Sequence, residues 1–411
     1  MALILEQSPH IKLRVIQVGT TVRKPLPVLQ AYLASLDWQE LPPQTRVEYA
    51  FIADYEDPAD PAESYLRAWA AERGGEVEAG DRGGSGDYGD TGGTTHLWRE
   101  SSRARVARNK NRLLQRALGR GADAVWLVDA DLLCDRSTLR SLWATEAPIA
   151  CGVYWTLWQE NVRGLQAAPQ VWLQHPYVLA GRGWEQGDFR RALLDRQRVT
   201  VYGQGACTLI RKGVLEKGID FSYIPGVSKE GMMAGEDRHF CMKAESAHLE
   251  MVADAWPDIY HIYHDRDVVR APAMLDRLGA PHPTTPTAEG LVSVILESVE
   301  PLPSGPPGQY YLVPVQHIRG RLAALGLLPE LEEAILGMKR GEVAMVPVHL
   351  PAHYEIQSLR GMRRIIKVNL VDCKPFGFPP TVEDELLSGS PGVWADPTQY
   401  TERQMNALVA P

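Results

Sequence analysis

The stretch AVWLVDAD, residues 124–131, runs from five apolar residues directly into two aspartates separated by one alanine. A short apolar run of this kind is typical of a strand buried on both faces. Asp129 and Asp131 lie two residues apart, so in extended chain both carboxylates can face one hard cation. Mg²⁺ and Mn²⁺ prefer such oxygen ligands. The alternative is an Asp-rich turn that only ends a strand, and the position behind a buried strand favours the functional interpretation.

Similar units of strand and helix precede this stretch. Buried strands are predicted at residues 14–19 and 47–53, and apolar residues at helical spacing predict helices at 26–36 and 104–118. Strands that alternate with helices of about 10 to 15 residues indicate βαβ units and a mostly parallel sheet. The sequence therefore predicts an α/β fold with a sheet flanked by helices. Ligands bind at the carboxyl ends of such strands, where we expect Gly19, Asp54 and Asp129.

Two segments interrupt this pattern. Residues 74–93 are rich in Gly and Asp and cannot bury a core, which predicts a mobile loop or a disordered segment and makes a calcium site the less favoured interpretation. Residues 271–289 contain Pro272, Pro281, Pro283 and Pro286, a composition typical of a linker. We therefore expect an α/β domain at residues 1–270, a linker at 271–289, a second domain at 290–375 and a tail at 376–411.

The second domain has a different pattern. Strands are predicted at residues 291–300, 309–315, 343–350 and 365–371, with a short helix at 330–336. This order indicates an α+β domain with a mainly antiparallel sheet.

The composition restricts the class of protein. The chain has 411 residues, 45% hydrophobic and 23% charged, with a formal net charge of −8. These values are typical of globular domains, and the acidic balance gives no general attraction to nucleic acid. No apolar run reaches the roughly 18 to 20 residues of a membrane span, and the N-terminus lacks the pattern of a secretory signal. The five scattered cysteines favour a reducing cytoplasm over a disulfide framework or a zinc site.

A basic segment precedes the two aspartates. Residues 99–120 carry eight Lys and Arg side chains, and within them Arg108 and Asn109 fall where a helix would approach the Asp129 end of the sheet. A guanidinium at that place can bind a pyrophosphate through two hydrogen bonds. The alternative is a solvated basic helix face.

Further candidates follow the aspartates. Glu236 and Asp237 stand at the start of a predicted helix, where the helix dipole stabilises carboxylates in any case. One of them can act as a general base, and on a helix the two side chains diverge by about 100°, so we expect only one to face a ligand. Gly205 lies in a small-residue turn that enters a strand. His261 and His264 lie in a segment that alternates like a strand, so they should point to opposite faces.

The order of these features resembles a GT-A glycosyltransferase of the family 2 type, with some similarity to the Anp1-like mannosyltransferases. The features are the first strand with its VGTTVRKP turn, Asp54, Arg108-Asn109, the pair Asp129 and Asp131, Gly235-Glu-Asp237 and a late His. The resemblance covers about residues 12–267. It implies transfer of a sugar from a UDP- or GDP-sugar to an unknown acceptor hydroxyl, with inversion.

The resemblance also implies roles for individual residues. Asp129 and Asp131 bind ribose and a divalent metal, Mn²⁺ or Mg²⁺, with either His261 or His264 as a third metal ligand. The second acid, Asp237, is the general base, with Glu236 as the alternative. The donor site that we expect from the motifs and the resemblance together consists of Thr20, Thr21, Arg23, Asp54, Arg108, Asn109, Asp129 and Gly205.

A second resemblance lies beyond the linker. Residues 331–342, 351–354 and 365–370 are similar to the second half of an FKBP-type prolyl isomerase domain. That family lines its pocket with aromatic residues, but residues 291–373 contain no Trp or Phe, only Tyr310, Tyr311 and Tyr354. We therefore expect a scaffold without isomerase activity, used for binding or homo-oligomerisation, and nucleotide binding that does not require it. The alternative functions are a prolyl isomerase or chaperone with a non-catalytic α/β domain, and a nucleic-acid-binding protein that uses residues 99–120.

Overall fold

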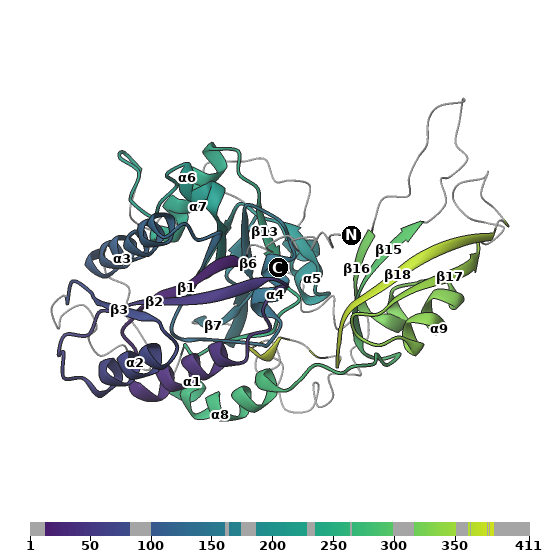
Figure 1. The fold of residues 1–411 in the computed structure, drawn as a ribbon, viewed down its shortest axis with the longest axis horizontal. Helices are drawn as coiled ribbons and strands as arrows, with labels where there is room; N and C mark the ends of the chain where they lie inside the picture. The colour runs from purple at the N-terminus through teal and green to yellow at the C-terminus, as the bar shows by residue number, and fades with distance from the viewer. Residues whose placement is uncertain are drawn as a thin grey trace, which may run out of the picture.

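The computed structural model shows a large α/β domain followed by a smaller sheet domain (Figure 1). It describes residues 13–82, 100–160, 164–173, 186–227, 235–263, 265–298, 316–350, 361, 363–375, 377 and 379–381. The main sheet has eight strands in the order β10 (Arg198–Thr200), β13 (Met251–Asp254), β6 (Ile149–Gly152), β12 (Cys207–Arg211), β4 (Ala124–Val128), β1 (Arg14–Val22), β2 (Thr45–Ala53) and β3 (Glu76–Ala79).

The direction of the strands brings their carboxyl ends to one edge. β1 is parallel to both β2 and β4, and β2 is parallel to β3. β12 runs antiparallel between β4 and β6, so the sheet is mixed. The predicted α/β class, a sheet flanked by helices, is therefore confirmed.

Helices cover both faces of this sheet because its strands are apolar on both faces. The β4 side chains alternate between the two cores: Val125 and Leu127 lie in one, Trp126 and Val128 in the other. The first core is covered by α3 (Glu100–Gly119), α5 (Gln186–Leu194), α6 (Lys212–Glu216) and α7 (Glu236–Ser246), the second by α1 (Leu26–Asp37), α2 (Pro61–Glu72) and α4 (Thr138–Trp143). α8 (Asp265–Gly279) packs against α1 (Figure 1).

Three short ribbons border the carboxyl edge of the sheet. They pair β5 (Leu132–Cys134) with β14 (Ile259–His261), β7 (Trp155–Glu160) with β8 (Gly164–Pro169), and β9 (Val171–Trp172) with β11 (Gly203–Gln204). They bring chain segments that lie far apart in the sequence next to the end of β4.

The structure corrects the expected loop at residues 74–93. Its first part forms β3, the edge strand, because Val77 packs against the core and the flanking glutamates pair with arginines of α3. Residues 83–93 lie outside the described part of the chain.

The expected linker also begins later than its composition suggests. α8 continues through Pro272 to Gly279, since Ala271, Met274 and Leu278 are buried against α1. Within residues 271–289, helix therefore occupies the first half, and residues 280–289 have neither helix nor strand.

The C-terminal domain, residues 291–374, is an antiparallel sheet with one helix. The strand order is β16 (Gln316–Arg321), β15 (Leu291–Ser298), β18 (Arg363–Lys374) and β17 (Val343–His349), and α9 (Pro329–Gly337) packs on it. The strand expected at 309–315 lies outside the described residues, as do Tyr310, Tyr311 and Tyr354, and the structure places a strand directly after it. Oligomerisation through this domain stays a prediction.

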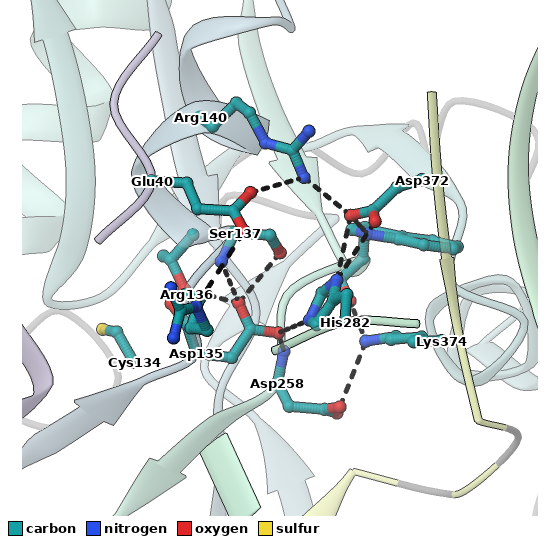
Figure 2. Close-up of polar contacts among 12 residues, drawn as sticks. Glu40, Cys134, Asp135, Arg136, Ser137, Arg140, Asp258, His282, Asp372 and Lys374 are labelled. Carbon is teal, nitrogen blue, oxygen red and sulfur yellow. Dashed lines mark hydrogen bonds and ion pairs between the residues drawn. The ribbon is translucent and has the colours of Figure 1, made fainter. Parts of the chain in front are cut away.

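A buried network of charges joins the two domains (Figure 2). Asp372 of β18 accepts hydrogen bonds from Trp256 Nε1 at 3.0 Å and Arg140 Nη2 at 2.9 Å, and its Oδ1 lies 3.1 Å from His282 Nδ1. Lys374 binds Asp258 at 3.1 Å. These contacts cross between the domains, so the C-terminal sheet is fixed to the α/β domain by largely buried polar contacts.

A second group of ion pairs lies beside this network. Asp254, at the end of β13, pairs with Arg319 of β16 and lies 3.1 Å from Arg198 of β10. The Asp254 side chain is fully buried. Because the two arginines come from different domains, each domain supplies one of the two cations beside this carboxylate.

No helix in the described part of the chain is long and apolar enough to cross a membrane. All five cysteines are described; they are buried and form no disulfide.

Candidate functional site

A cavity of about 260 Å³ opens at the carboxyl end of β4. Its walls come from the turn after β4, from the start of α7 and from the three ribbons. The residues that line it are Arg103, Asp129, Asp131, Tyr154, Thr156, Gln170, Trp172, Gly205, Ala206, Gly235, Glu236, Asp237, Arg238, His261 and Tyr263. The structure thus brings together six of the predicted site residues: Gly205, Asp129, Asp131, Glu236, Asp237 and His261.

The turn after β4 holds the two aspartates in the cavity wall. The Leu132 amide donates to the Asp129 carbonyl at 3.0 Å and closes the turn. The next strand, β5, pairs with β14 and sets Leu132 opposite His261, so the imidazole lies beside Asp131. His261 Nε2 is 3.5 Å from Asp131 Oδ2, and Lys24 Nζ is 2.6 Å from the same oxygen.

The ring of His261 is held from behind. Its Nδ1 lies 2.8 Å from Thr156 Oγ1, and the Tyr154 ring meets it edge-on with 5.2 Å between the centroids. A hydrogen bond at one ring nitrogen fixes the orientation in which the other nitrogen faces the cavity. In this arrangement Nε2 and the Asp131 carboxylate face each other.

These donors fit a divalent cation whose coordination is completed by other ligands. A carboxylate oxygen and an imidazole nitrogen converge, and Asp129 lines the same cavity. The described residues contain no group of three or more His, Cys, Asp or Glu side chains that could hold a metal by themselves. Mg²⁺ sites commonly use one or two carboxylates and take their remaining ligands from water and substrate phosphates. His264 lies outside the described residues.

The acid pair at the start of α7 faces the same cavity. Gly235 precedes the helix with a φ of 111°, a conformation that favours glycine. Lys110 Nζ of α3 lies 2.8 Å from both Glu236 Oε1 and Asp237 Oδ1. Both acids line the cavity, because the buried ammonium draws both carboxylates to one point. That only one of them faces a ligand stays a prediction. They differ in access: the Asp237 side chain is 27% exposed and that of Glu236 5%.

Burial and Lys110 together set the ionisation of these acids. Burial raises the pKa of Asp129 to about 7 and that of Asp237 to about 6, while the charge of Lys110 opposes both shifts. Burial would lower the pKa of Lys110, but Asp237 and Glu236 hold it well above its usual value. The cavity therefore contains two carboxyl groups that titrate near neutral pH around one permanent cation. Perturbed acids in a cleft are typical of functional sites.

Gly205 is part of the cavity wall for a steric reason. A Cβ at this position would lie 2.5 Å from the Tyr154 hydroxyl oxygen. That hydroxyl accepts a hydrogen bond from the Ala206 amide at 3.1 Å. Only glycine therefore allows this close packing beside Asp129.

Apart from Asp129 and Gly205, the residues expected to form the donor site do not line this cavity. Thr20 and Thr21 belong to β1, which continues beyond the expected turn. Gly19 also lies inside this strand, where a Cβ would meet the Ala50 carbonyl. Arg23 pairs with Glu56 at 2.5 Å. Asp54 follows β2 at the same edge as Asp129, but its carboxylate is fully buried and pairs with Arg105 at 2.7 Å. Their roles in nucleotide binding stay predictions.

The structure places Arg108 and Asn109 differently from each other. Arg108 points to the surface and pairs with Asp81 at 2.6 Å, away from Asp129. Lys110 takes the position that was expected of Arg108. Arg108 and Lys110 are two residues apart in the sequence, so their side chains lie on different faces of α3. Asn109 is buried, and its Nδ2 has no hydrogen-bond partner among the described residues.

Lys24, Lys110 and Thr156 complete the site but were missed in the sequence. Lys110 lies next to Arg108-Asn109, and the helical period would have separated its face from theirs. Lys24 precedes Pro25 at the start of α1, which fixes the turn but gives no sign of a partner 107 positions away. No local pattern marks Thr156.

Comparisons with known proteins give a weak likeness of fold. No family model and no curated protein sequence matches the chain. The crystal structure of S. aureus TarS matches 64% of this chain and 39% of its own, with 16% identity and a TM-score of 0.35. S. aureus TarS 1-349 in complex with UDP-GlcNAc matches 60% and 58%, with 17% identity and a TM-score of 0.33.

Mannosyltransferase PcManGT from Pyrobaculum calidifontis, in complex with GDP-Man and Mn²⁺, matches 61% of this chain and 59% of its own, with 15% identity and a TM-score of 0.32. The matches thus span between 39% and 59% of these three chains. Neither the Anp1-like nor the FKBP-like resemblance receives support. The comparisons assign the chain to no family.

Proposed function

We propose that the protein is a glycosyltransferase that moves a sugar from a nucleoside diphosphate sugar to an acceptor hydroxyl. One observation carries the proposal. A single cavity at the carboxyl end of β4 contains a carboxylate–imidazole pair suited to a cation, Asp131 and His261, and an acid pair suited to proton transfer, Glu236 and Asp237. A reaction with an anionic leaving group and a hydroxyl nucleophile needs both.

The leaving-group side of the cavity is formed by Asp129, Asp131 and His261. A divalent cation held there would neutralise the negative charge of the departing diphosphate. Thr156 orients His261, and the turn after β4 orients both carboxylates, so these side chains are ordered before a ligand arrives. Such preorganisation is what electrostatic stabilisation of a leaving group requires.

The proton-transfer side is formed by Asp237. Lys110 binds one of its oxygens, and the other has no hydrogen-bond or ion-pair partner among the described residues. We propose that this oxygen takes the proton of the acceptor hydroxyl. The hydroxyl oxygen then bonds to the anomeric carbon as the bond from that carbon to the diphosphate breaks, which inverts the anomeric centre. Glu236 is nearly inaccessible and serves to hold Lys110.

The nucleotide is proposed to lie beside this cavity along the same edge of the sheet, where β1 and β2 end. Thr21 Oγ1, near the end of β1, and Asn109 Nδ2, on α3, are buried without hydrogen-bond partners among the described residues. Groups of this kind are expected to find a partner when a polar ligand binds. The donor is proposed to be a UDP- or GDP-sugar.

The basic helix does not favour nucleic acid as the ligand. Arg112, Arg116 and Arg120 pair with the glutamates of β3, and Arg105 and Arg108 pair with aspartates. The positive charge of α3 is thus largely neutralised within the chain.

The proposal is tested by donor turnover on the full chain. UDP- and GDP-sugars are incubated with the protein and Mn²⁺, and release of the nucleoside diphosphate to water is measured without an acceptor. We expect slow release from one of the donors, abolished by Asp129→Asn. No release from any donor, together with no binding of UDP or GDP, would contradict the proposal.

A further inference from the structure

The inference concerns Lys24, which follows β1. Its ammonium lies 2.6 Å from Asp131 Oδ2, and the side chains of the two residues are 13% and 4% exposed. The same carboxylate oxygen lies 3.5 Å from His261 Nε2. One buried oxygen is therefore shared between a resident ammonium and the imidazole with which it would hold a cation.

The backbone of Lys24 is held firmly. The Tyr55 hydroxyl donates to its carbonyl oxygen at 2.9 Å, and Pro25 follows directly at the N-cap position of α1. The ring of Tyr55 is buried in the second core. The ammonium thus reaches Asp131 from a fixed anchor, and only the flexible side chain can move away.

The charges make Lys24 and a metal mutually exclusive. A divalent cation between Asp131 and His261 would need the oxygen that Lys24 now contacts, and it would meet an ammonium at a few ångströms with little water between them. Two positive charges at such a distance repel strongly where the surroundings are buried. The ammonium has to leave Oδ2 before the cation can use it.

We propose that Lys24 is a resident counter-ion that competes with the divalent metal for Asp131, so that metal binds well only when an anion receives the displaced ammonium. That anion is the diphosphate of the donor, an assignment that rests on the proposed function. Metal and nucleoside diphosphate then bind cooperatively, and each raises the affinity for the other by the same factor.

The test measures Mn²⁺ binding to the full chain without nucleotide, from the electron paramagnetic resonance signal of free Mn²⁺. We expect Lys24→Met to bind Mn²⁺ at least tenfold more tightly than the wild type, and Lys24→Arg to behave like the wild type. Arg23→Met is the matched control, because it removes the neighbouring charge without touching Asp131. Its gain should be much smaller. The double variant Lys24→Met/Asp131→Asn should lose the gain.

A second measurement uses the unaltered protein and so avoids any variant that folds poorly. Mn²⁺ affinity is determined with and without UDP or GDP, and we expect at least a tenfold increase with nucleotide. In Lys24→Met this factor should fall towards one.

The proposal is overturned if Lys24→Met binds Mn²⁺ no more tightly than the wild type, or if Arg23→Met gains as much. A tighter Mn²⁺ site in Lys24→Met without any nucleotide binding would retain the competition and reject the proposed function. Metal-dependent nucleotide binding with unchanged Mn²⁺ affinity in Lys24→Met would do the reverse.

Discussion

Lys110 is the residue on which the chemistry of the acid pair depends. It is buried, it contacts Glu236 and Asp237 at the same distance of 2.8 Å, and its charge also acts on Asp129. Without it, the four carboxyl groups that line the cavity would lack this cation, and some would be protonated at neutral pH. The lysine therefore keeps Asp237 ionised while leaving it accessible.

The first prediction concerns the general base. Asp237→Asn should lower turnover of the donor by about 10²–10⁴-fold, the usual contribution of acid–base catalysis, and leave nucleotide affinity unchanged. Glu236→Gln should reduce turnover less, since its side chain is only 5% exposed. Steady-state rates and calorimetric affinities measure both effects. If Glu236→Gln is inactive and Asp237→Asn is active, the two roles are reversed.

The second prediction is the pH dependence. A base must be ionised, and because the pKa of Asp237 is raised to about 6, turnover should rise with pH through that value. Lys110→Met removes the charge that opposes this shift, so the rise should move to higher pH. Lys243→Met is the control on α7: this lysine pairs with Asp220 near the surface, and its removal should leave the profile unchanged. An unchanged profile in Lys110→Met would contradict the role assigned to it.

Among the secondary-structure elements, the sequence predicted those whose stability is local. β4 was predicted with its exact bounds, and β1, α1, β2 and α3 differ from prediction only at their ends. Continuous apolar runs and helical spacing identify such elements without any knowledge of their neighbours.

β3 could not be predicted in this way. Its sequence, EVEA, contains one large apolar residue, and its glutamates pair with arginines of α3 and with Arg120 directly after it, 34 to 44 positions further along the chain. The site was predictable to a similar degree. Asp129 and Asp131 follow a recognisable strand, whereas Lys24 and Lys110 become site residues only through contacts at separations of 107 and 126 positions.

The third prediction separates two arginines of the same helix. Arg105→Met leaves the fully buried carboxylate of Asp54 without its cation and should lower the free energy of unfolding by about 3–5 kcal/mol. Arg108→Met breaks a largely exposed pair with Asp81 and should lower it by about 0–1 kcal/mol. Chemical denaturation measures both. Equal losses would show that the Asp54–Arg105 contact is not the buried ion pair described above.

In the whole molecule, the two domains are less separable than the composition suggests. The linker proline content predicted independent parts, but Asp254, Asp258 and Asp372 each bind a cation of the other domain. The residues that pair are more than 60 positions apart, so no local pattern reveals them. A chain that ends at residue 279 would remove one cationic partner from Asp254 and one from Asp258. Nucleotide binding without the C-terminal domain stays a prediction.

The fourth prediction is the pH range of stability. The arginines and lysine of the junction hold the pKa values of Asp254 and Asp258 below the usual range, and His282 and Arg140 do the same for Asp372. Groups with a lowered pKa stabilise the fold above their unfolded pKa of about 3.9, and this stabilisation is lost as pH falls. Bonding to Asp372 raises the pKa of His282, so its contribution is present at low pH and is lost as pH rises through that value. Calorimetry of the full chain should show one transition that is highest between these limits.

Arg319→Met provides the check on this account. It removes the cation that the C-terminal domain supplies to Asp254, so the melting temperature should fall and the loss of stability at acid pH should become shallower. Arg321→Met is the control, two residues further along the chain than Arg319. It breaks an exposed pair with Glu289 and should change neither the melting temperature nor the loss of stability at acid pH. Two separate transitions in the wild type would show that the junction does not couple the domains.

The most direct measurement is calorimetric titration of UDP and GDP into the full chain, once with Mn²⁺ and once with EDTA, for the wild type and for Asp131→Asn. We expect one of the nucleotides to bind and Mn²⁺ to tighten its binding. In Asp131→Asn this metal-dependent part should be lost, about 1–3 kcal/mol for a charge-assisted contact. Equal affinities in Mn²⁺ and EDTA, or no binding of either nucleotide to a folded wild-type protein, would contradict this expectation.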